Sequence, residues 1–241
     1  MKQILTLLAL LICSPAFASY DCDGNNDVLE AGAAVVSGYP FTVAGWVKPQ
    51  ALGVTGSRPF ALGTDGSEDD WYVLHRTTDD RFRVVIDEGG TFTGVNSGSL
   101  NSTTTWFHII AVFASSTDVR AYVDGGSQGS MNPGLTPAAP NQTHFCETMT
   151  NSNDFDGKIA HFGVWDIALD ATARTALAGG GNPLAVEAAN LQAYWPMLED
   201  ANDDKGAFHL TVTGATLDGA DNPTVDAPPS ASGALLRRRR N

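Results

Sequence analysis

Short stretches that alternate apolar and polar residues recur along this chain, with turn residues between them. The stretches 81–87 and 118–123 place an apolar side chain at every second position. Strand side chains point alternately to the two faces of a sheet, so this period predicts half-buried strands. The stretch 107–113 is almost wholly apolar, and we expect both faces of that strand to be covered. Asp124-Gly125-Gly126 predicts a hairpin turn after residue 123.

Other apolar stretches of strand length lie between runs of glycine, proline and polar residues. They predict strands at Phe41–Val47, Pro59–Leu62, Trp71–Leu74, Lys158–Trp165, Leu191–Trp195 and Phe208–Thr213. The intervening loops are expected at 51–58, 65–70, 94–105, 125–144 and 148–156.

Only residues 171–178 have the pattern of a helix, with Asp170 as the N-cap and Gly179 after the last turn. Many short strands with one short helix predict an all-β fold, a two-sheet antiparallel jelly-roll sandwich. Large rings inside the strands of such a fold are expected to fill the space between the sheets. The candidates are Trp46, Trp106, Trp165 and Trp195.

The two ends of the chain differ from its body. Residues 1–18 have the form of a secretory signal: Lys2, an apolar stretch, and an A-x-A cleavage site that ends at Ala18. One domain is expected over 19–227, followed by a flexible linker and the arginine run Arg237–Arg240 within 228–241. No later stretch is apolar for the ~18 residues that a membrane helix needs.

The formal net charge is −13, although four of the 14 basic residues belong to the C-terminal arginine run. The body is therefore strongly acidic. Such a body repels nucleic acid and anionic lipid, so neither is an expected partner of the domain. The arginine run is suited to an acidic partner, which the sequence does not identify.

Two cysteines, Cys22 and Cys146, remain once the predicted signal is removed. An even number of cysteines in an exported chain allows one disulfide, which would tie the first strand of the domain to a late one. The alternative is a pair of free buried thiols.

Five blocks of the chain, taken in order, resemble the laminin-G/pentraxin-like branch of the concanavalin A-like jelly rolls. The blocks are Cys22–Asp27, Phe41–Pro49, Trp106–Gly125, Asp156–Asp166 and Ala168–Met197. The resemblance implies a sandwich of about fourteen strands and a binding role. Members of this family often hold Ca²⁺ on loops. The acidic loop that precedes residue 156 in pentraxin-like members is altered here, because it keeps only Glu147, Asp154 and Asp156.

Closely spaced oxygen ligands give the candidate calcium site, because Ca²⁺ takes six to eight oxygens. The candidate ligands are Asp21, Asp23, Asn25, Asp27 and, from a second acidic patch at 199–204, Asp203. The first group is not an EF-hand, since Asn26 stands where that loop needs glycine. The alternative is that these residues form turns without metal, which Asp and Asn also favour.

Three kinds of catalytic site are not supported. The run 125–129 matches G-x-S-x-G, but the residues after it cannot form the helix that this motif requires. No strand carries alternating acids for glycoside hydrolysis, and the adjacent Asp87 and Glu88 point to opposite faces. The histidines lack the spacing of a zinc site.

These features predict a secreted, non-catalytic binding module for carbohydrate or another surface ligand, with calcium as a possible aid. The predicted ligand-binding residues lie on two loops: Asp69, Asp70, Trp71, Tyr72, Asn153 and Asp154. Aromatic rings stack on sugar rings, and carboxylates and amides hold hydroxyls directly or through Ca²⁺. The alternatives are a structural subunit of a cell surface, matrix or virion, with the arginine run as a docking peptide, and a polysaccharide-degrading enzyme.

Overall fold

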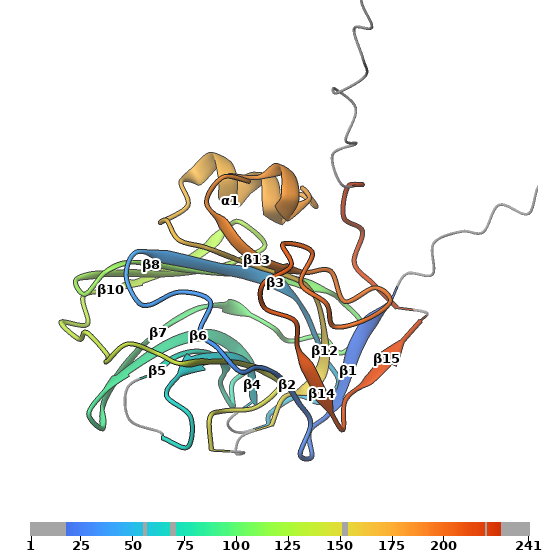
Figure 1. The fold of residues 1–241 in the computed structure, drawn as a ribbon, viewed down its shortest axis with the longest axis horizontal. Coiled ribbons are helices and arrows are strands. Elements are labelled where there is room, and N and C mark those ends of the chain that lie inside the picture. The colour runs from blue at the N-terminus through green and yellow to red at the C-terminus, as the bar shows by residue number, and fades with distance from the viewer. Residues whose placement is uncertain (1–17, 55–56, 68–70, 151–153, 220, 228–241) are drawn as a thin grey trace, which may run out of the picture.

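The computed structural model describes residues 18–54, 57–67, 71–150, 154–219 and 221–227. The predicted signal before Ala18 and the predicted linker and arginine run lie outside them. Two antiparallel sheets pack face to face (Figure 1). This confirms the predicted sandwich.

The eight-stranded sheet contains β1 (Ser19–Asp23), β3 (Phe41–Pro49), β8 (Phe107–Ser115), β9 (Asp118–Val123), β10 (Ser127–Met131), β12 (Asp156–Trp165), β13 (Leu191–Trp195) and β15 (Thr216–Asp218). Its order is β10-β9-β8-β3-β12-β1-β15, and β13 also pairs with β12. The seven-stranded sheet contains β2 (Val28–Ala31), β4 (Ser57–Gly63), β5 (Trp71–Arg76), β6 (Arg81–Glu88), β7 (Thr91–Ser99), β11 (Gln142–Phe145) and β14 (Thr211–Thr213). Its order is β14-β2-β11-β4-β5-β6-β7.

The consecutive short strands β14 and β15 join the two sheets along one side of the sandwich. β14 pairs with β2 in the seven-stranded sheet, whereas β15 pairs with β1 in the eight-stranded sheet. The chain turns between them at Gly214, whose φ of +77° favours glycine. Two consecutive short strands therefore form an edge of each sheet.

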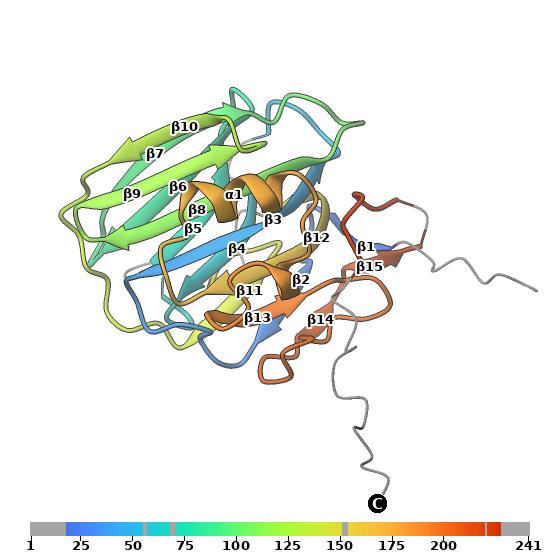
Figure 2. The ribbon, with the colours of Figure 1, turned by 90° about the horizontal axis from the view of Figure 1, so that it is seen from above.

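Alternate side chains of both sheets meet in one apolar core. Phe41 and Phe113 stack there with ring centroids 4.3 Å apart, and Phe145 meets Trp195 edge-on at 5.0 Å. All seven residues of 107–113 are buried, as predicted for a strand covered on both faces. The second cover is α1 (Ala171–Ala178), which lies over β3 and β8 on the outer face of the eight-stranded sheet (Figure 2).

The helix forms where the sequence predicted it. The side chain of Asp170 accepts a hydrogen bond from the backbone N–H of Ala173 at 2.8 Å, and Gly179 follows the last turn. Ala173 and Leu177 are the buried residues of the helix. After α1 the chain makes one 3₁₀ turn, η1 (Pro183–Ala185), before it enters β13.

The tryptophans fill the space between the sheets only in part. Trp195 belongs to that core, as predicted. Trp165 is fully buried on the opposite side of its sheet, under α1. Trp46 and Trp106 are only partly buried, and the indole N–H of Trp106 donates to Asp221 at 2.9 Å. The prediction was wrong for Trp46, Trp106 and Trp165. The outer face of the eight-stranded sheet is itself partly covered, by α1 among other segments, so that face also holds large rings.

Two predicted loops are wrong. The stretch 94–105 overlaps β7, and 125–144 contains β10 and the start of β11. These strands are rich in glycine, serine and threonine, so their own propensity is weak. Pairing with the neighbouring strands β6 and β9 holds β7 and β10 in place. The G-x-S-x-G match falls on the turn and strand of the β9–β10 hairpin, so no nucleophile elbow exists there.

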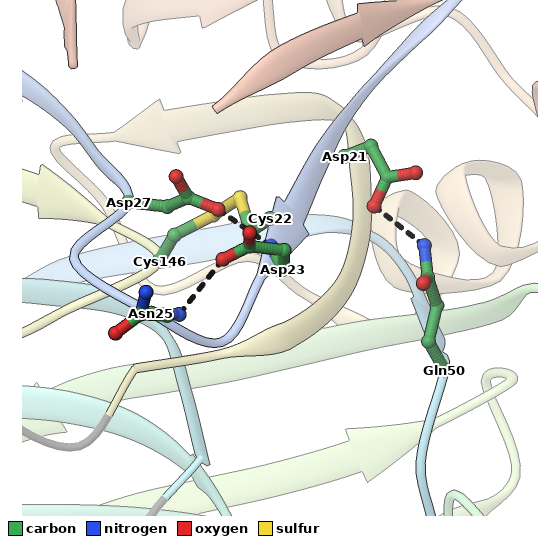
Figure 3. Close-up of a disulfide and its surroundings, with 7 residues drawn as sticks. All are labelled: Asp21, Cys22, Asp23, Asn25, Asp27, Gln50 and Cys146. Atoms are coloured by element: carbon green, nitrogen blue, oxygen red, sulfur yellow. Dashed lines mark hydrogen bonds between the residues drawn. A yellow bond between two sulfur atoms is a disulfide. The ribbon is translucent and has the colours of Figure 1, made fainter. Parts of the chain in front are cut away.

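The predicted disulfide is present. Cys22 of β1 bonds to Cys146, which follows β11, with Cα atoms 6.3 Å apart (Figure 3). The bond joins the eight-stranded sheet to the segment that leaves the seven-stranded sheet. The alternative of two free thiols is thereby excluded.

A strap of residues 221–227 runs along the outer face of the eight-stranded sheet. The carboxylate of Asp221 accepts hydrogen bonds from Lys48 at 2.7 Å and from Lys158 at 2.9 Å. These lysines and Trp106 hold the pKa of Asp221 at about 2, although partial burial opposes the shift. Further along, the backbone N–H of Asp226 donates to Gly180 after α1. Within the described residues, no helix has the length and apolar character that crossing a membrane requires.

Candidate functional site

The two aromatic residues predicted to bind ligand do not act together. Trp71 and Tyr72 are consecutive in β5, so their side chains leave opposite faces of the seven-stranded sheet. Trp71 is only 9% exposed and packs outside with Val73 and Met149, and the Arg58 guanidinium lies 4.5 Å from its ring centroid. The prediction of an exposed stacking ring at Trp71 was therefore wrong.

Tyr72 points into the sandwich. Its ring lies edge-on to Phe41 at 5.0 Å and to Phe113 at 5.3 Å. The side chain nevertheless reaches one end of the sandwich, because Tyr72 lines a hollow there. A Cβ atom placed on Gly38, at the rim of that hollow, would lie 3.7 Å from the Tyr72 hydroxyl.

The hollow at this end has a volume of about 480 Å³, and we call it the Tyr39 hollow. It lies where the segment leading into β3, the end of β8, the β10–β11 connection and β5 come together. Its lining residues are Ser37, Gly38, Tyr39, Pro40, Tyr72, Ala114, Ser115, Ser116, Thr136 and Pro137. Aromatic rings, prolines and hydroxyl groups dominate this lining, and none of the ten residues carries a charge.

The wall of the hollow is held in place by aromatic packing and by hydrogen bonds, one of them from Tyr39. The Tyr39 ring meets Tyr72 edge-on at 5.4 Å. The Tyr39 hydroxyl donates to the carbonyl oxygen of Leu135 at 3.1 Å, which ties the segment before β3 to the β10–β11 connection. Burial, and to a lesser degree the charge of Glu88, raises the pKa of Tyr39 to about 12. Tyr39 therefore stays neutral over the whole physiological range.

Two smaller hollows flank the segment before β3 that carries Tyr39. One, of about 390 Å³, is lined by residues 32–37 with Pro140 and Asn141. The other, of about 320 Å³, is lined by residues 35–40 with Asp166 and Gln192. Residues 32–40 therefore stand between three hollows at one end of the sandwich, where sites on jelly-roll loops commonly form.

The sequence reasoning missed Tyr39 and the hydroxyl residues of the hollow. Ser37, Ser115, Ser116 and Thr136 lie in three separate segments, and their spacing shows no pattern that would link them. Only the sheet topology brings these segments together. A weak signal was present, because Ser37-Gly38-Tyr39-Pro40 and Ser115-Ser116-Thr117 have the composition of functional loops.

The remaining predicted ligand residues are elsewhere. Asp69, Asp70 and Asn153 lie outside the described residues. Asp154 is described, and its Oδ2 accepts a hydrogen bond from the backbone N–H of Asn26 at 2.9 Å. Asn26 does not line the Tyr39 hollow.

Asp154 belongs instead to a group of acids around the segment that follows β11. Glu147 is only 3% exposed, and its Oε1 lies 3.8 Å from Nδ1 of His144. Burial, together with the charges of Asp154 and Glu30, raises the pKa of Glu147 to about 7. A proton on Glu147 relieves the repulsion within this group.

The first four predicted calcium ligands serve other partners. Asp27 accepts the backbone N–H of Asp23 at 2.5 Å, and Asp23 accepts that of Asn25 at 2.9 Å. Asp21 points away from them and accepts from the Gln50 amide at 2.5 Å (Figure 3). These contacts are those of an acidic turn, the alternative considered from the sequence.

In Asp203 both carboxylate oxygens accept hydrogen bonds. Its Oδ1 accepts the backbone N–H groups of Tyr194 and Lys205, each at 2.8 Å, and its Oδ2 accepts those of Ala207 and Phe208 at 3.0 and 3.1 Å. Its role is to fix the turn after β13. Across the described part of the chain, no three Asp, Glu, His or Cys side chains are grouped so that they could hold a metal ion. The predicted aspartates do not form such a group.

Comparisons with known proteins agree with the fold. The family model described as the concanavalin A-like lectin/glucanases superfamily matches residues 23–173. No curated protein matches the chain. The heptameric SAP-like pentraxin from Limulus polyphemus is similar in structure, with a TM-score of 0.58 and 14% identity over 83% of this chain and 95% of that one.

Two sugar complexes share the same fold. Domain 4 of AbnA, a GH43 arabinanase from Geobacillus stearothermophilus, was solved with arabinotriose; it has a TM-score of 0.51 and 14% identity over 66% of this chain and 99% of that one. The sialidase CBM40 from Ruminococcus gnavus, bound to α2,3-sialyllactose, has a TM-score of 0.52 and 10% identity over 69% of this chain and 100% of that one. Identities this low establish the fold alone. With the family model covering well over half of its length, the chain belongs to the concanavalin A-like lectin/glucanase superfamily.

Proposed function

We propose that this protein is a secreted, non-catalytic module that binds carbohydrate, and that the Tyr39 hollow holds the sugar. The observation that carries the proposal is the lining of the hollow, which combines two tyrosines with four hydroxyl side chains and no charge. A sugar offers C–H faces that pack on aromatic rings and hydroxyls that exchange hydrogen bonds with hydroxyl groups. The volume of about 480 Å³ lies within the range typical of small-molecule sites.

Three further observations support the proposal. The arabinanase domain and the CBM40 hold oligosaccharides on this same fold. A disulfide between Cys22 and Cys146 suits an oxidising compartment outside the cytoplasm, which agrees with the signal-like residues 1–18. The G-x-S-x-G match does not form a nucleophile elbow, and Asp87 and Glu88 are consecutive in β6, so neither supports an enzyme.

Calcium assistance stays a prediction. The candidate ligands accept hydrogen bonds from backbone N–H groups or from the side-chain amides of Gln50 and Asn26, and the Tyr39 hollow is proposed to bind sugar without a metal. A parallel measurement in Ca²⁺ and in EDTA tests this directly, because sugar binding at the hollow should be the same in both.

The test is a glycan array probed with the full chain, produced so that the disulfide forms. Ser116→Phe places a ring in the hollow and should abolish binding. Thr103→Phe makes the same change at an exposed position in the β7–β8 connection and should bind like the wild type. Both variants should keep the wild-type far-UV circular dichroism spectrum and melting temperature to within a few degrees.

Other outcomes would contradict the proposal. If the wild-type chain binds no glycan but self-associates or captures an acidic partner through Arg237–Arg240, the structural-subunit alternative replaces it. If the wild-type chain depolymerises a polysaccharide, the module is an enzyme. If Ser116→Phe binds as the wild type does, the sugar lies outside the Tyr39 hollow.

A further inference from the structure

We infer that the Tyr39 hollow selects uncharged sugar units and rejects carboxylated ones such as sialic and uronic acids. The inference rests on the proposed function, since it names the class of sugar that the same hollow would take. It follows from three features: the uncharged lining of the hollow, the carboxylates of Glu88 and Asp166 beside it, and the pairing of Arg120 with Asp118.

The lining offers nothing that would compensate an anion. All ten lining residues are described, and none is Lys, Arg or His. Tyr39, whose pKa is about 12, already donates its hydroxyl proton to Leu135. A carboxylate brought into the hollow would lose part of its water shell without meeting a cation, and taking a charge out of water without a partner is unfavourable.

Two carboxylates, those of Glu88 and Asp166, lie beside the hollow and form what we call its rim. Glu88, at the end of β6, accepts a hydrogen bond through Oε2 from the backbone N–H of Thr136 at 3.0 Å, and Thr136 lines the hollow. The charge of Glu88 is felt inside, because it contributes to the raised pKa of Tyr39. Asp166 lines the neighbouring hollow, which shares Tyr39 and Pro40 with the first. An approaching anion therefore meets two carboxylates of like charge.

The cation that follows the serines of the lining is already paired. Arg120 follows the β8–β9 turn that carries Ser115 and Ser116, and its guanidinium is hydrogen-bonded to the carboxylate of Asp118. It therefore brings no net positive charge to the rim. A neutral sugar requires no such charge, because its hydroxyls can pair with Ser37, Ser115, Ser116 and Thr136.

The fold itself does not impose this selection. The CBM40 that resembles this chain in structure is bound to α2,3-sialyllactose, an acidic sugar. Two modules with the same sandwich should thus separate neutral from acidic glycans according to the side chains of their sites. This makes the inference specific to the residues of this chain.

The test compares matched sugars that differ in one carboxylate. Lactose is paired with α2,3-sialyllactose, and oligomers of galactose are paired with oligomers of galacturonic acid. Affinities are measured by isothermal titration calorimetry at low ionic strength. We expect the better neutral sugar to bind at least about tenfold more tightly than its acidic counterpart, and the ratio to shrink as salt is added.

Glu88→Gln isolates the contribution of the rim. Glutamine can still accept the Thr136 N–H through its amide oxygen, so the loop geometry is kept. The variant should bind acidic sugars several-fold better than the wild type and neutral sugars equally well. Glu199→Gln removes the same charge from an exposed position after β13 and should change neither affinity.

The outcomes separate the inference from the proposed function. Equal or tighter binding of the carboxylated sugars, lost in Ser116→Phe, would overturn the selection for neutral sugars while leaving the carbohydrate site in place. An unchanged discrimination in Glu88→Gln would overturn the role of the rim. Absence of binding to either class, or full binding by Ser116→Phe, would overturn both the site and its selectivity.

Discussion

Trp71 and Tyr72 are neighbours in β5, yet one packs outside the seven-stranded sheet and the other packs between the sheets. Trp71 contacts Met149 and the Arg58 guanidinium, whereas Tyr72 contacts Phe41 and Phe113. Only Tyr72 reaches the Tyr39 hollow. The alternation of a strand thus divides two residues that the sequence placed in one site.

This division predicts different effects of two aromatic substitutions. Tyr39→Ala removes a ring that lines the hollow and should weaken binding of a neutral glycan by at least about tenfold, a change of about 1.4 kcal/mol. Trp71→Phe keeps a buried ring outside the sheet and should leave that affinity unchanged. Calorimetric titration of both variants gives the answer. A larger loss in Trp71→Phe than in Tyr39→Ala would move the site to the outer face of the sheet.

The disulfide should be the largest single contribution to stability. Cys22 and Cys146 are separated by 124 positions. Closing a loop of this length restricts the unfolded chain by about 5 kcal/mol in the chain-entropy model. The Cys22→Ala/Cys146→Ala double variant should lose a comparable free energy of unfolding in urea titrations. Reduction of the wild-type protein should reproduce the loss, and an unchanged urea midpoint in both experiments would contradict this account.

Substitution of Asp203 should lower the stability of the protein and leave metal binding unaffected. Its carboxylate satisfies four backbone N–H groups of the turn after β13. Asp203→Ala leaves buried donors without a partner and should cost about 3 kcal/mol of unfolding free energy. Asp200→Ala, at an exposed position nearby, is the control and should cost little. If calcium stabilises the wild-type protein and Asp203→Ala removes that effect, Asp203 is a metal ligand after all.

Buried histidines, His108 and His161 above all, should make the protein less stable in acid. Burial lowers the pKa of His108 to about 3 and that of His161 to about 4. An ordinary histidine titrates near 6.5, so between about pH 6.5 and 4 the unfolded chain takes up protons that the folded chain excludes. Stability therefore falls as the pH falls, by about 2 kcal/mol per histidine at pH 5.

Urea unfolding at pH 7 and pH 5 measures this loss. His108→Gln and His161→Gln should each reduce the difference between the two pH values. A difference that persists in the variant with His108 and His161 both replaced would assign the remaining acid sensitivity to other groups, such as buried His144, whose pKa burial also lowers.

Glu147 should make the stability of the protein depend on pH in the opposite direction. Its pKa is raised from 4.5 to about 7 by burial and by Asp154 and Glu30. Between those values the folded state holds a proton that the unfolded chain has lost, so stability falls as the pH rises. At pH 8 the free energy of unfolding of Glu147→Gln, measured in urea, should exceed that of the wild type by at least about 1 kcal/mol. At pH 4 the two free energies should be equal. A gain at both pH values would point to packing instead of charge.

Local pattern was sufficient to predict much of the architecture. The alternation at 81–87, the fully apolar stretch 107–113 and the capped helix 171–178 each follow from contacts close in sequence, and all three are confirmed. The weak strands β7 and β10 were missed because their stability comes from pairing with β6 and β9. A strand held mainly by its neighbours carries little signal of its own.

The sequence by itself determined the two-sheet fold and the pair of cysteines available for a disulfide, because alternation and cysteine number are properties of the chain alone. Only the tertiary structure decided which side chains share a site. Ser37, Tyr39, Ser116 and Thr136 come together because the segment before β3, the β8–β9 turn and the β10–β11 connection end at one side of the sandwich. Strand order sets that meeting, and it depends on hydrogen bonds between segments far apart in the chain.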